Sequence, residues 1–241
     1  MNIAEKLTTI ADNQQRVYEA GKTAEYDAFW DAFQRNGTRS NYYVAFYSAN
    51  AREPFWTDKN FKPKYPISPT NAQNMLSCSS VSGDLREKAD IDFSKATNVN
   101  AAISYCSNLT AIGKIDLRNV SSNSISAVTY CDALESIEEI IFKDDGTQYA
   151  SSAGFSFTGC PLLKEVRIKG VINFNFNAGM CTNLSKASIE SIVNALYAPT
   201  TGKTFTVSSS AVTAAFGSTK EKEWEDLVDT KPNWTVVLSG G

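Results

Sequence analysis

Histidine is absent from the 241 residues of the chain. The chain therefore lacks the commonest general base of enzymes, the usual zinc ligand and the side chain that most often titrates near neutral pH. Without histidine the usual Ser–His and Cys–His nucleophilic sites are excluded, and no constellation of carboxylates points to glycoside hydrolysis. We expect a protein that is not an enzyme and that binds no metal and no cofactor.

A long apolar run and an excess of basic charge are also missing. No apolar stretch approaches the roughly 20 residues that span a bilayer, and the formal net charge of −3 gives no footprint for nucleic acid. Residues 1–6 lack the basic and apolar parts of a secretory signal. We expect no nucleic-acid partner, no membrane insertion and no signal peptide. The protein is then cytoplasmic when made, and associated with a virion after assembly if a phage encodes it.

The five cysteines occur at regular intervals along the chain. They stand at positions 78, 106, 131, 160 and 181, spaced by 28, 25, 29 and 21 residues. An odd number of cysteines without an export signal argues against a disulfide framework. A mostly apolar residue lies three positions before each cysteine: Met75, Ile103, Val128, Phe157 and Ala178. A leucine lies three positions after four of them: Leu109, Leu134, Leu163 and Leu184. Each cysteine is therefore interpreted as a small buried residue that stacks on the next copy.

A short alternating segment follows three of the cysteines. These segments span 114–118, 139–143 and 165–169, with an earlier copy at 90–94. Alternation of apolar and polar residues with a period of two is typical of a half-buried strand. The predicted inward pairs are Ile91/Phe93, Ile115/Leu117, Ile140/Phe142 and Val166/Ile168. A repeat of about 20–29 residues with one such strand predicts a leucine-rich-repeat solenoid.

The repeats also carry a family resemblance. Residues 106–112, 131–137 and 160–166 read Cys-x-x-Leu-x-x-Ile, with Val at the end of the third copy. This motif resembles the core of BspA-like leucine-rich repeats over roughly residues 70–185. The resemblance implies a solenoid of short parallel strands and a role in adhesion.

The two ends of the chain differ from the repeats. Apolar and small residues at alternating spacings of four and three, from Ile3 to Ala28, form a heptad seam that ends near Asn36-Gly37. This seam either drives oligomerisation or covers the end of the solenoid. The aromatic run 41–47 suggests a strand, and four prolines follow it. Near the other end, 189–196 has the pattern of an amphipathic helix. Ser218 to Glu221 reads as a capping box before a second helix, and residues 234–238 alternate like a last strand.

These patterns divide the chain into four predicted parts of an α/β protein. They are an N-terminal helix (1–37, for oligomerisation or as a cap), an aromatic and proline-rich segment (38–74), the leucine-rich-repeat solenoid (75–185) and a C-terminal helix-strand-helix-strand cap (186–241). The C-terminal part resembles the end of repeat proteins encoded by prophages of gut-dwelling Gram-positive bacteria. The N-terminus resembles those of phage structural proteins.

Three local motifs have plainer interpretations than they first suggest. Residues 197–204 end in Gly-Lys-Thr like a phosphate-binding loop, but Tyr197 stands where that loop needs glycine, so we predict a turn from helix to strand. Asp144-Asp145-Gly146 lacks the other ligands of a calcium loop and is also predicted to be a turn. The lysines at 59, 62 and 64, beside Phe61 and Tyr65, indicate a solvated loop rather than a nucleic-acid surface.

The leading hypothesis is a non-catalytic binding or structural protein, phage- or prophage-encoded and associated with the tail or virion, that serves in adhesion or receptor binding. The alternatives are a bacterial cell-surface adhesin of the BspA-like type and an intracellular protein-interaction scaffold. The expected partner is a protein or a cell-wall glycan, and the N-terminal helix offers a route to a homo-oligomer.

The candidate partner surface is the outward side of the repeat strands. If the strands stack in register, one outward column reads Asp92, Asp116, Ile141 and Arg167. A second reads Ser94, Arg118, Lys143 and Lys169 and is basic over three rungs. Stacked like charges are costly unless an anionic group lies against them, so the second column predicts either an acidic partner or a set of long side chains that splay into water.

Overall fold

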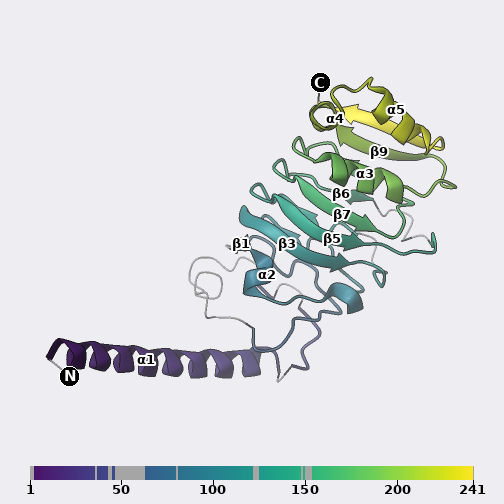
Figure 1. Cartoon of the computed structure of the whole chain (residues 1–241). Helices are drawn as coiled ribbons and strands as arrows, with labels where there is room; N and C mark the ends of the chain where they lie inside the picture. Colours follow the sequence, from purple (N-terminus) through teal and green to yellow (C-terminus); the bar gives the residue numbers. More distant parts are fainter. Residues whose placement is uncertain are drawn as a thin grey trace.

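The computed structural model describes residues 3–35, 37–42, 45–46, 63–79, 81–121, 125–147, 149 and 154–240, without the side chains of 3–11 and 18. A long helix, α1 (Ile3–Phe33), extends away from a stack of parallel strands that rises toward the C-terminus (Figure 1). The protein is of the mixed α/β class, and every strand pairing is parallel among the described residues.

The strands form two larger sheets and one small one. The first sheet has the order β1 (Ser82–Asp84), β3 (Asn108–Asp116), β5 (Ser136–Ile141) and β7 (Glu165–Lys169). The second has the order β10 (Trp234–Ser239), β9 (Lys203–Ser208), β8 (Phe176–Ala178) and β6 (Phe155–Ser156). The third pairs β2 (Ile103–Ser104) with β4 (Val128–Thr129). A short helix, α2 (Leu85–Lys88), and a 3-10 turn, η1 (Phe93–Lys95), follow β1.

The first sheet aligns the motif copies that the sequence indicates. Ile112 pairs with Ile137, and Ile137 pairs with Val166, each six residues after its cysteine. All three side chains are buried. Each copy therefore contributes one rung, meaning one strand layer, and the apolar side chains of neighbouring rungs cover one another.

The register changes beyond this point, because β7 is one residue shorter than β5. Between the paired positions β5 has Glu138 and Glu139 where β7 has only Arg167, and Ile140 then pairs with Ile168. Such a bulge leaves the inward residues aligned and shifts the outward ones. The alternation predicts that Ile140 pairs with Val166 and Phe142 with Ile168. This register is wrong, because Ile137 pairs with Val166 and Ile140 pairs with Ile168.

A second line of strands precedes the cysteines and is absent from the strand predictions. β2, β4, β6 and β8 each end a few residues before a repeat cysteine. The apolar residues three before the cysteines, Ile103, Val128, Phe157 and Ala178, are buried in or beside these strands. The regular position of these residues could have indicated the strands, but strands of two or three residues are too short for an alternation to be visible.

The first cysteine does not belong to the buried column. The N–H of Cys78 donates to Ser104, and that of Tyr105 to Thr129, so Cys78 is equivalent to Tyr105 and Ser79 to Cys106. Cys78 is exposed, whereas the other four cysteines are buried. Of the five cysteines predicted to stack inside, four do so, and the apolar position of the first copy is Leu76 rather than Met75.

The C-terminal elements continue the stack. They are α3 (Lys186–Ala195), β9, α4 (Ser209–Phe216), α5 (Lys222–Asp229) and β10. The helix α4, which begins with Ser208 accepting a hydrogen bond from the N–H of Ala211, is an addition to the predicted helix-strand-helix-strand order. The predicted capping box is wrong, because Glu221 occupies the N-cap of α5 without a side-chain bond and Ser218 accepts from the N–H of Lys220.

Among the side chains of α1 that the structure describes, those buried against the rest of the molecule lie near its end. Trp30 is buried in an aromatic cluster with Phe33, Tyr42 and Phe46. The described seam positions, which are Gln14, Val17, Gly21, Ala24 and Ala28, are all exposed, so this seam does not cover the repeats. The predicted strand 41–47 is not seen in its described part, where Asn41 makes an isolated bridge with Asn71 and 45–46 lie in a turn. Residues 43, 44 and 47 lie outside the described residues, as do the lysines at 59 and 62. Within the described ranges, no helix combines the length and apolar character needed to cross a membrane.

Candidate binding surface

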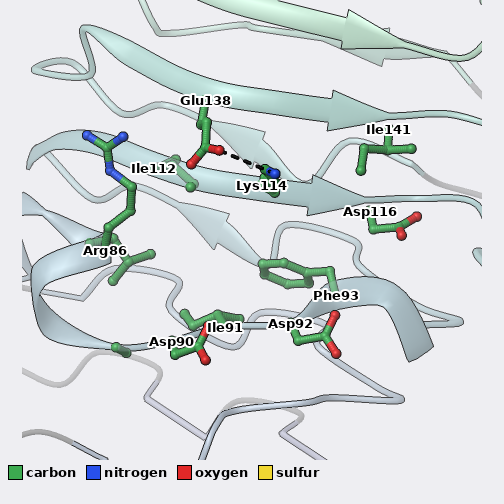
Figure 2. A pocket seen from close by; sticks show the side chains of 13 residues that line it. Arg86, Asp90, Ile91, Asp92, Phe93, Ile112, Lys114, Asp116, Glu138 and Ile141 are labelled. Carbon is green, nitrogen blue, oxygen red and sulfur yellow. Dashed lines mark ion pairs between the residues drawn. The ribbon is translucent and has the colours of Figure 1, made fainter.

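The outer face of the first sheet is hollowed between α2 and α3, and we call this surface the open face. Two hollows of about 480 and 350 Å³ lie on it, and both are lined by Arg86 and Glu138. The first lies between α2, η1 and the strands β3 and β5 (Figure 2). The second lies between β5, β7 and α3. The open face therefore spans three successive rungs.

The outward residues of the strands follow from their alternation. Ile112, Ile115, Ile137 and Ile140 are buried, so the residues between them, such as Lys114 and Glu138, project from the other side. Lys114 Nζ and Glu138 Oε1 are 3.5 Å apart across the two strands (Figure 2). Both side chains are more than a third exposed, so this pair contributes little to stability and remains available to a ligand.

Arg86 joins the two hollows and is held in place by a carboxylate. Its guanidinium donates two hydrogen bonds of 2.9 and 2.5 Å to the carboxylate of Asp84, at the start of α2. These bonds lower the pKa of Asp84 below its usual range. The side-chain methylenes of Arg86 pack over Gly113, where an added Cβ would lie 3.3 Å from Cγ. Arg86 is thus fixed in position beside the hollows.

Asp116 lines the first hollow and is paired with Arg118. Asp116 is only 7% exposed, and its carboxylate accepts bonds of 3.0 and 2.6 Å from Nε and Nη2 of Arg118. Burial acts to raise the pKa of Asp116, but the hydrogen bonds from the side chain and backbone of Arg118 lower it by more. Asp116 is therefore a carboxylate at neutral pH and is unsuited to act as a general acid.

The far edge of the open face is closed by hydroxyl groups of α3. The N–H groups of Val166 and Ile168, on the edge strand β7, donate to the hydroxyls of Ser188 and Ser191 at 2.9 and 2.8 Å. These bonds satisfy donors that a free sheet edge would leave unpaired. Arg167 projects between them into the second hollow and is exposed. Its side chain makes no ion pair with another residue of the described chain.

The structure brings together only part of the predicted partner surface. Asp92, Asp116 and Ile141 line the first hollow, as Figure 2 shows, and Arg167 lines the second. Arg118, Lys143 and Lys169 lie beyond the hollows, at or after the carboxyl ends of the strands.

The predicted order of the two columns is wrong. Asp116 pairs with Ile141, and Ile141 pairs with Lys169 rather than with Arg167, because of the bulge in β5. Lys169 is therefore aligned with Asp116 and Ile141 and does not belong to the predicted basic column. Arg118 is neutralised by Asp116, and the ammonium of Lys143 lies 4.7 Å from the ring centroid of Tyr149. No continuous basic column remains.

Four charged residues that line the first hollow were not predicted as part of the partner surface: Arg86, Asp90, Lys114 and Glu138. The strand alternation was a signal for Lys114 and Glu138. Arg86 and Asp90 belong to a helix of four residues and the turn after it, whose position against β3 no pattern in the sequence indicates.

Three of the four buried cysteines have thiols with a raised pKa. The neighbouring thiol of Cys106 raises the pKa of Cys131 to about 12. The thiol of Cys131, followed by burial, raises the pKa of Cys160, and burial raises that of Cys181. A thiol with a raised pKa is a poor nucleophile. Among the described residues, no three His, Cys, Asp or Glu side chains gather in a way that suits a metal ion.

The fold and the surface define a mixed α/β protein with parallel sheets and a hollowed, charged sheet face. Comparisons with protein-family models, with curated proteins and with solved structures gave no match to this chain.

Proposed function

We propose that the chain is a non-catalytic binding protein built as a BspA-like leucine-rich-repeat solenoid. Three features support the solenoid. The Cys-x-x-Leu-x-x-Ile motif recurs, each copy contributes a parallel rung, and four of the cysteines lie in the buried core. Stacked repeats bury a continuous core and leave an extended surface, which such proteins use for binding.

The open face is the proposed binding surface, and its hollows are the observation that carries the proposal. Exposed charged side chains from several elements converge there, including Arg86, Lys114, Glu138 and Arg167. The first hollow is acidic overall, with four carboxylates against two cations. Arg167 and Lys169 make the β7 end basic. A partner that places basic groups over the first hollow and an acidic group against Arg167 and Lys169 of β7 fits this surface.

A non-catalytic role is supported by the state of the acidic residues. Asp116 is held as a carboxylate by Arg118, and Asp92 accepts the N–H of Ser94 at the start of η1. General acid catalysis needs a protonated group near its working pH, and the lowered pKa of Asp116 opposes this.

We further propose a phage- or prophage-encoded, virion-associated accessory that serves in adhesion or receptor binding. The resemblance of both chain ends to phage-encoded proteins supports this role. The projecting helix α1 supports it as well, because its exposed seam suits assembly with a partner (Figure 1). Proteomic analysis of particles induced from the bacterium that carries the gene tests this assignment, and absence of the protein from purified particles contradicts it.

The binding role is tested with wall fragments of Gram-positive bacteria, pelleted with the labelled full chain before and after removal of their anionic polymer. We expect the intact walls to retain the protein. Arg167→Glu with Lys169→Glu should abolish retention, because both side chains are exposed and lie at the basic end of the open face.

The matched control is Lys95→Glu with Lys220→Glu, which makes the same change of charge at exposed positions that line neither hollow. It should bind like the wild type. Equal binding by the Arg167/Lys169 variant, or no binding by the wild type, overturns the proposed partner surface. Arg118 is not a suitable position for this test, because its replacement would leave the buried Asp116 without its ion-pair partner.

A further inference from the structure

A second exposed surface lies at the opposite end of the strands. The residues just before three of the repeat cysteines, Tyr105, Tyr130 and Gly159, have left-handed backbones with φ of 55°, 54° and 71°. They stack rung on rung, because the N–H of Tyr105 donates to Thr129 and that of Tyr130 to Thr158. Tyr105 precedes β3 and Arg118 follows it, so this row lies far from the basic end of the open face.

Tyrosine is a costly residue at these two positions. A left-handed backbone brings Cβ against the carbonyl group, and glycine or asparagine normally occupies it. Gly159 shows which residue the same corner accepts without strain. Neither ring is buried in return, since Tyr105 and Tyr130 are 54% and 42% exposed. The exposed Cys78 has the same left-handed backbone at the equivalent position, with a φ of 57°, so the strain is common to this corner. What distinguishes the two tyrosine rungs is a pair of large exposed rings that burial does not account for.

The rings belong to a continuous apolar strip. They stack in parallel with centroids 4.6 Å apart and an interplanar angle of 6°. Tyr130 also lies against Gly159, where an added Cβ would be 2.6 Å from Cδ1 of the ring. The N–H of Gly159 points to Sδ of Met180 at 3.5 Å. Tyr105, Tyr130, Gly159 and Met180 together form what we call the tyrosine strip, and Met180 is 51% exposed.

The surroundings of the strip are almost free of charge. The four turns 105–109, 130–134, 159–163 and 180–184 contain a single charged residue, Asp132. Their other exposed polar side chains are hydroxyls and amides: Ser107, Asn108, Thr182 and Asn183. The strip is one residue wide, whereas a stable protein interface buries about 800 Å² on each partner.

We infer that the tyrosine strip binds an uncharged polysaccharide. The C–H faces of successive sugar units pack against the exposed parts of Tyr105 and Tyr130 and against the Met180 thioether, and their hydroxyls pair with the tyrosine hydroxyls and the neighbouring amides. A narrow chain matches a narrow strip, and an uncharged ligand matches a surface with almost no charge. This site is separate from the open face and does not depend on it.

The test is native gel electrophoresis of the full chain in gels that contain a soluble β-glucan, a galactomannan or dextran. We expect at least one of the three to retard the protein. Tyr105→Asn with Tyr130→Asn should weaken that binding by about tenfold or more, the scale of losing an aromatic stacking contact. Because asparagine tolerates a left-handed backbone, the thermal midpoint should stay unchanged or rise.

Two control variants show whether a loss of binding is specific to the tyrosine strip. Val237→Asn with Leu238→Asn removes two similarly exposed apolar side chains from β10 and should leave the retardation unchanged. Arg167→Glu with Lys169→Glu should also be retarded normally, even where it loses binding to walls.

The inference fails if none of the three polysaccharides retards the wild type. It also fails if the tyrosine variant binds like the wild type, or if its thermal midpoint falls together with binding, which would assign the rings to folding. A change of mass in the tyrosine variant, without polysaccharide binding by the wild type, would identify the strip as a contact between protein chains.

Discussion

The repeats and the helix α1 both carry apolar residues at regular spacing, yet the two regions bury them differently. Ile137, Ile140 and Phe142 are at most 1% exposed, whereas Val17 in the seam of α1 is 74% exposed. Each repeat strand finds its partner in the next copy of the same chain. The helix finds none along most of its length, as Figure 1 shows. Periodic patterns therefore predict which side chains need a partner, but not whether the chain itself supplies it.

The largest expected effect lies in the repeat core. Phe142 is fully buried and makes edge-to-face contacts with Tyr149, Phe155 and Phe174. Phe142→Ala should lower the free energy of unfolding by about 3–5 kcal/mol, because it leaves a cavity. Chemical denaturation measures this change. Val17→Ala is the comparison in α1 and should change the free energy of unfolding by less than about 0.5 kcal/mol. A similar loss of stability in both variants would contradict the difference between the repeat core and α1.

The next effect concerns close packing between rungs. Gly170 has a φ of +83°, and an added Cβ would lie 2.3 Å from the carbonyl oxygen of Phe142. Gly202 has a φ of +66° but open space around it. Gly202→Ala should therefore cost about 1–3 kcal/mol from the backbone alone, and Gly170→Ala should cost more. Thermal unfolding of both variants checks this order, which a larger loss at Gly202 would reverse.

A smaller effect is expected at the ion pair of Asp116 and Arg118. Arg118→Gln should lower the free energy of unfolding by about 1–3 kcal/mol at pH 7, because it leaves a buried carboxylate without its cation. The pKa of Asp116 is lowered in the folded state, below the value of about 3.9 expected in the unfolded chain. The stabilisation is thus present above about pH 4 and is lost as the pH falls through the folded-state pKa.

Denaturation of wild type and Arg118→Gln at several pH values measures the difference. It should be greatest near neutrality and should shrink in acid. A difference that is constant from pH 7 to pH 3 would mean that Arg118 acts through packing rather than through its charge.

The smallest effect on stability, but a clear effect on mass, is expected in α1. If the seam joins α1 to α1 of a second copy, Val17→Glu should convert the protein to a monomer at micromolar concentration, because it places like charges in the seam. Its thermal midpoint should change little, since Val17 contacts no other part of the chain's core. Light scattering measures the mass. A wild-type protein that is already monomeric would contradict the oligomer.

Much of the repeat region was predictable, because its signals are local. The residues at fixed distances from the last four cysteines identified the inward side of their motif copies, and Leu109, Leu134, Leu163 and Leu184 are all buried as expected. The C-terminal strand and the helix at 189–196 were also visible in their periodicity, and they correspond to β10 and α3. The helix α4 was missed, because it is short and its small side chains leave Val212 and Phe216 as its only large apolar residues.

The candidate surface was less predictable, because outward residues are positioned by the register between rungs. The sequence by itself determined that the motif copies stack and which side chains they bury, since one spacing recurs from copy to copy. Only the tertiary structure decided that Ile141 pairs with Lys169, that Arg118 neutralises Asp116, and that the first cysteine lies outside the buried column. The pairing of Ile141 depends on a bulge, and the exposure of the first cysteine depends on a one-residue offset. An apolar core constrains the inward positions strongly, whereas backbone hydrogen bonds between distant segments settle where the outward ones meet.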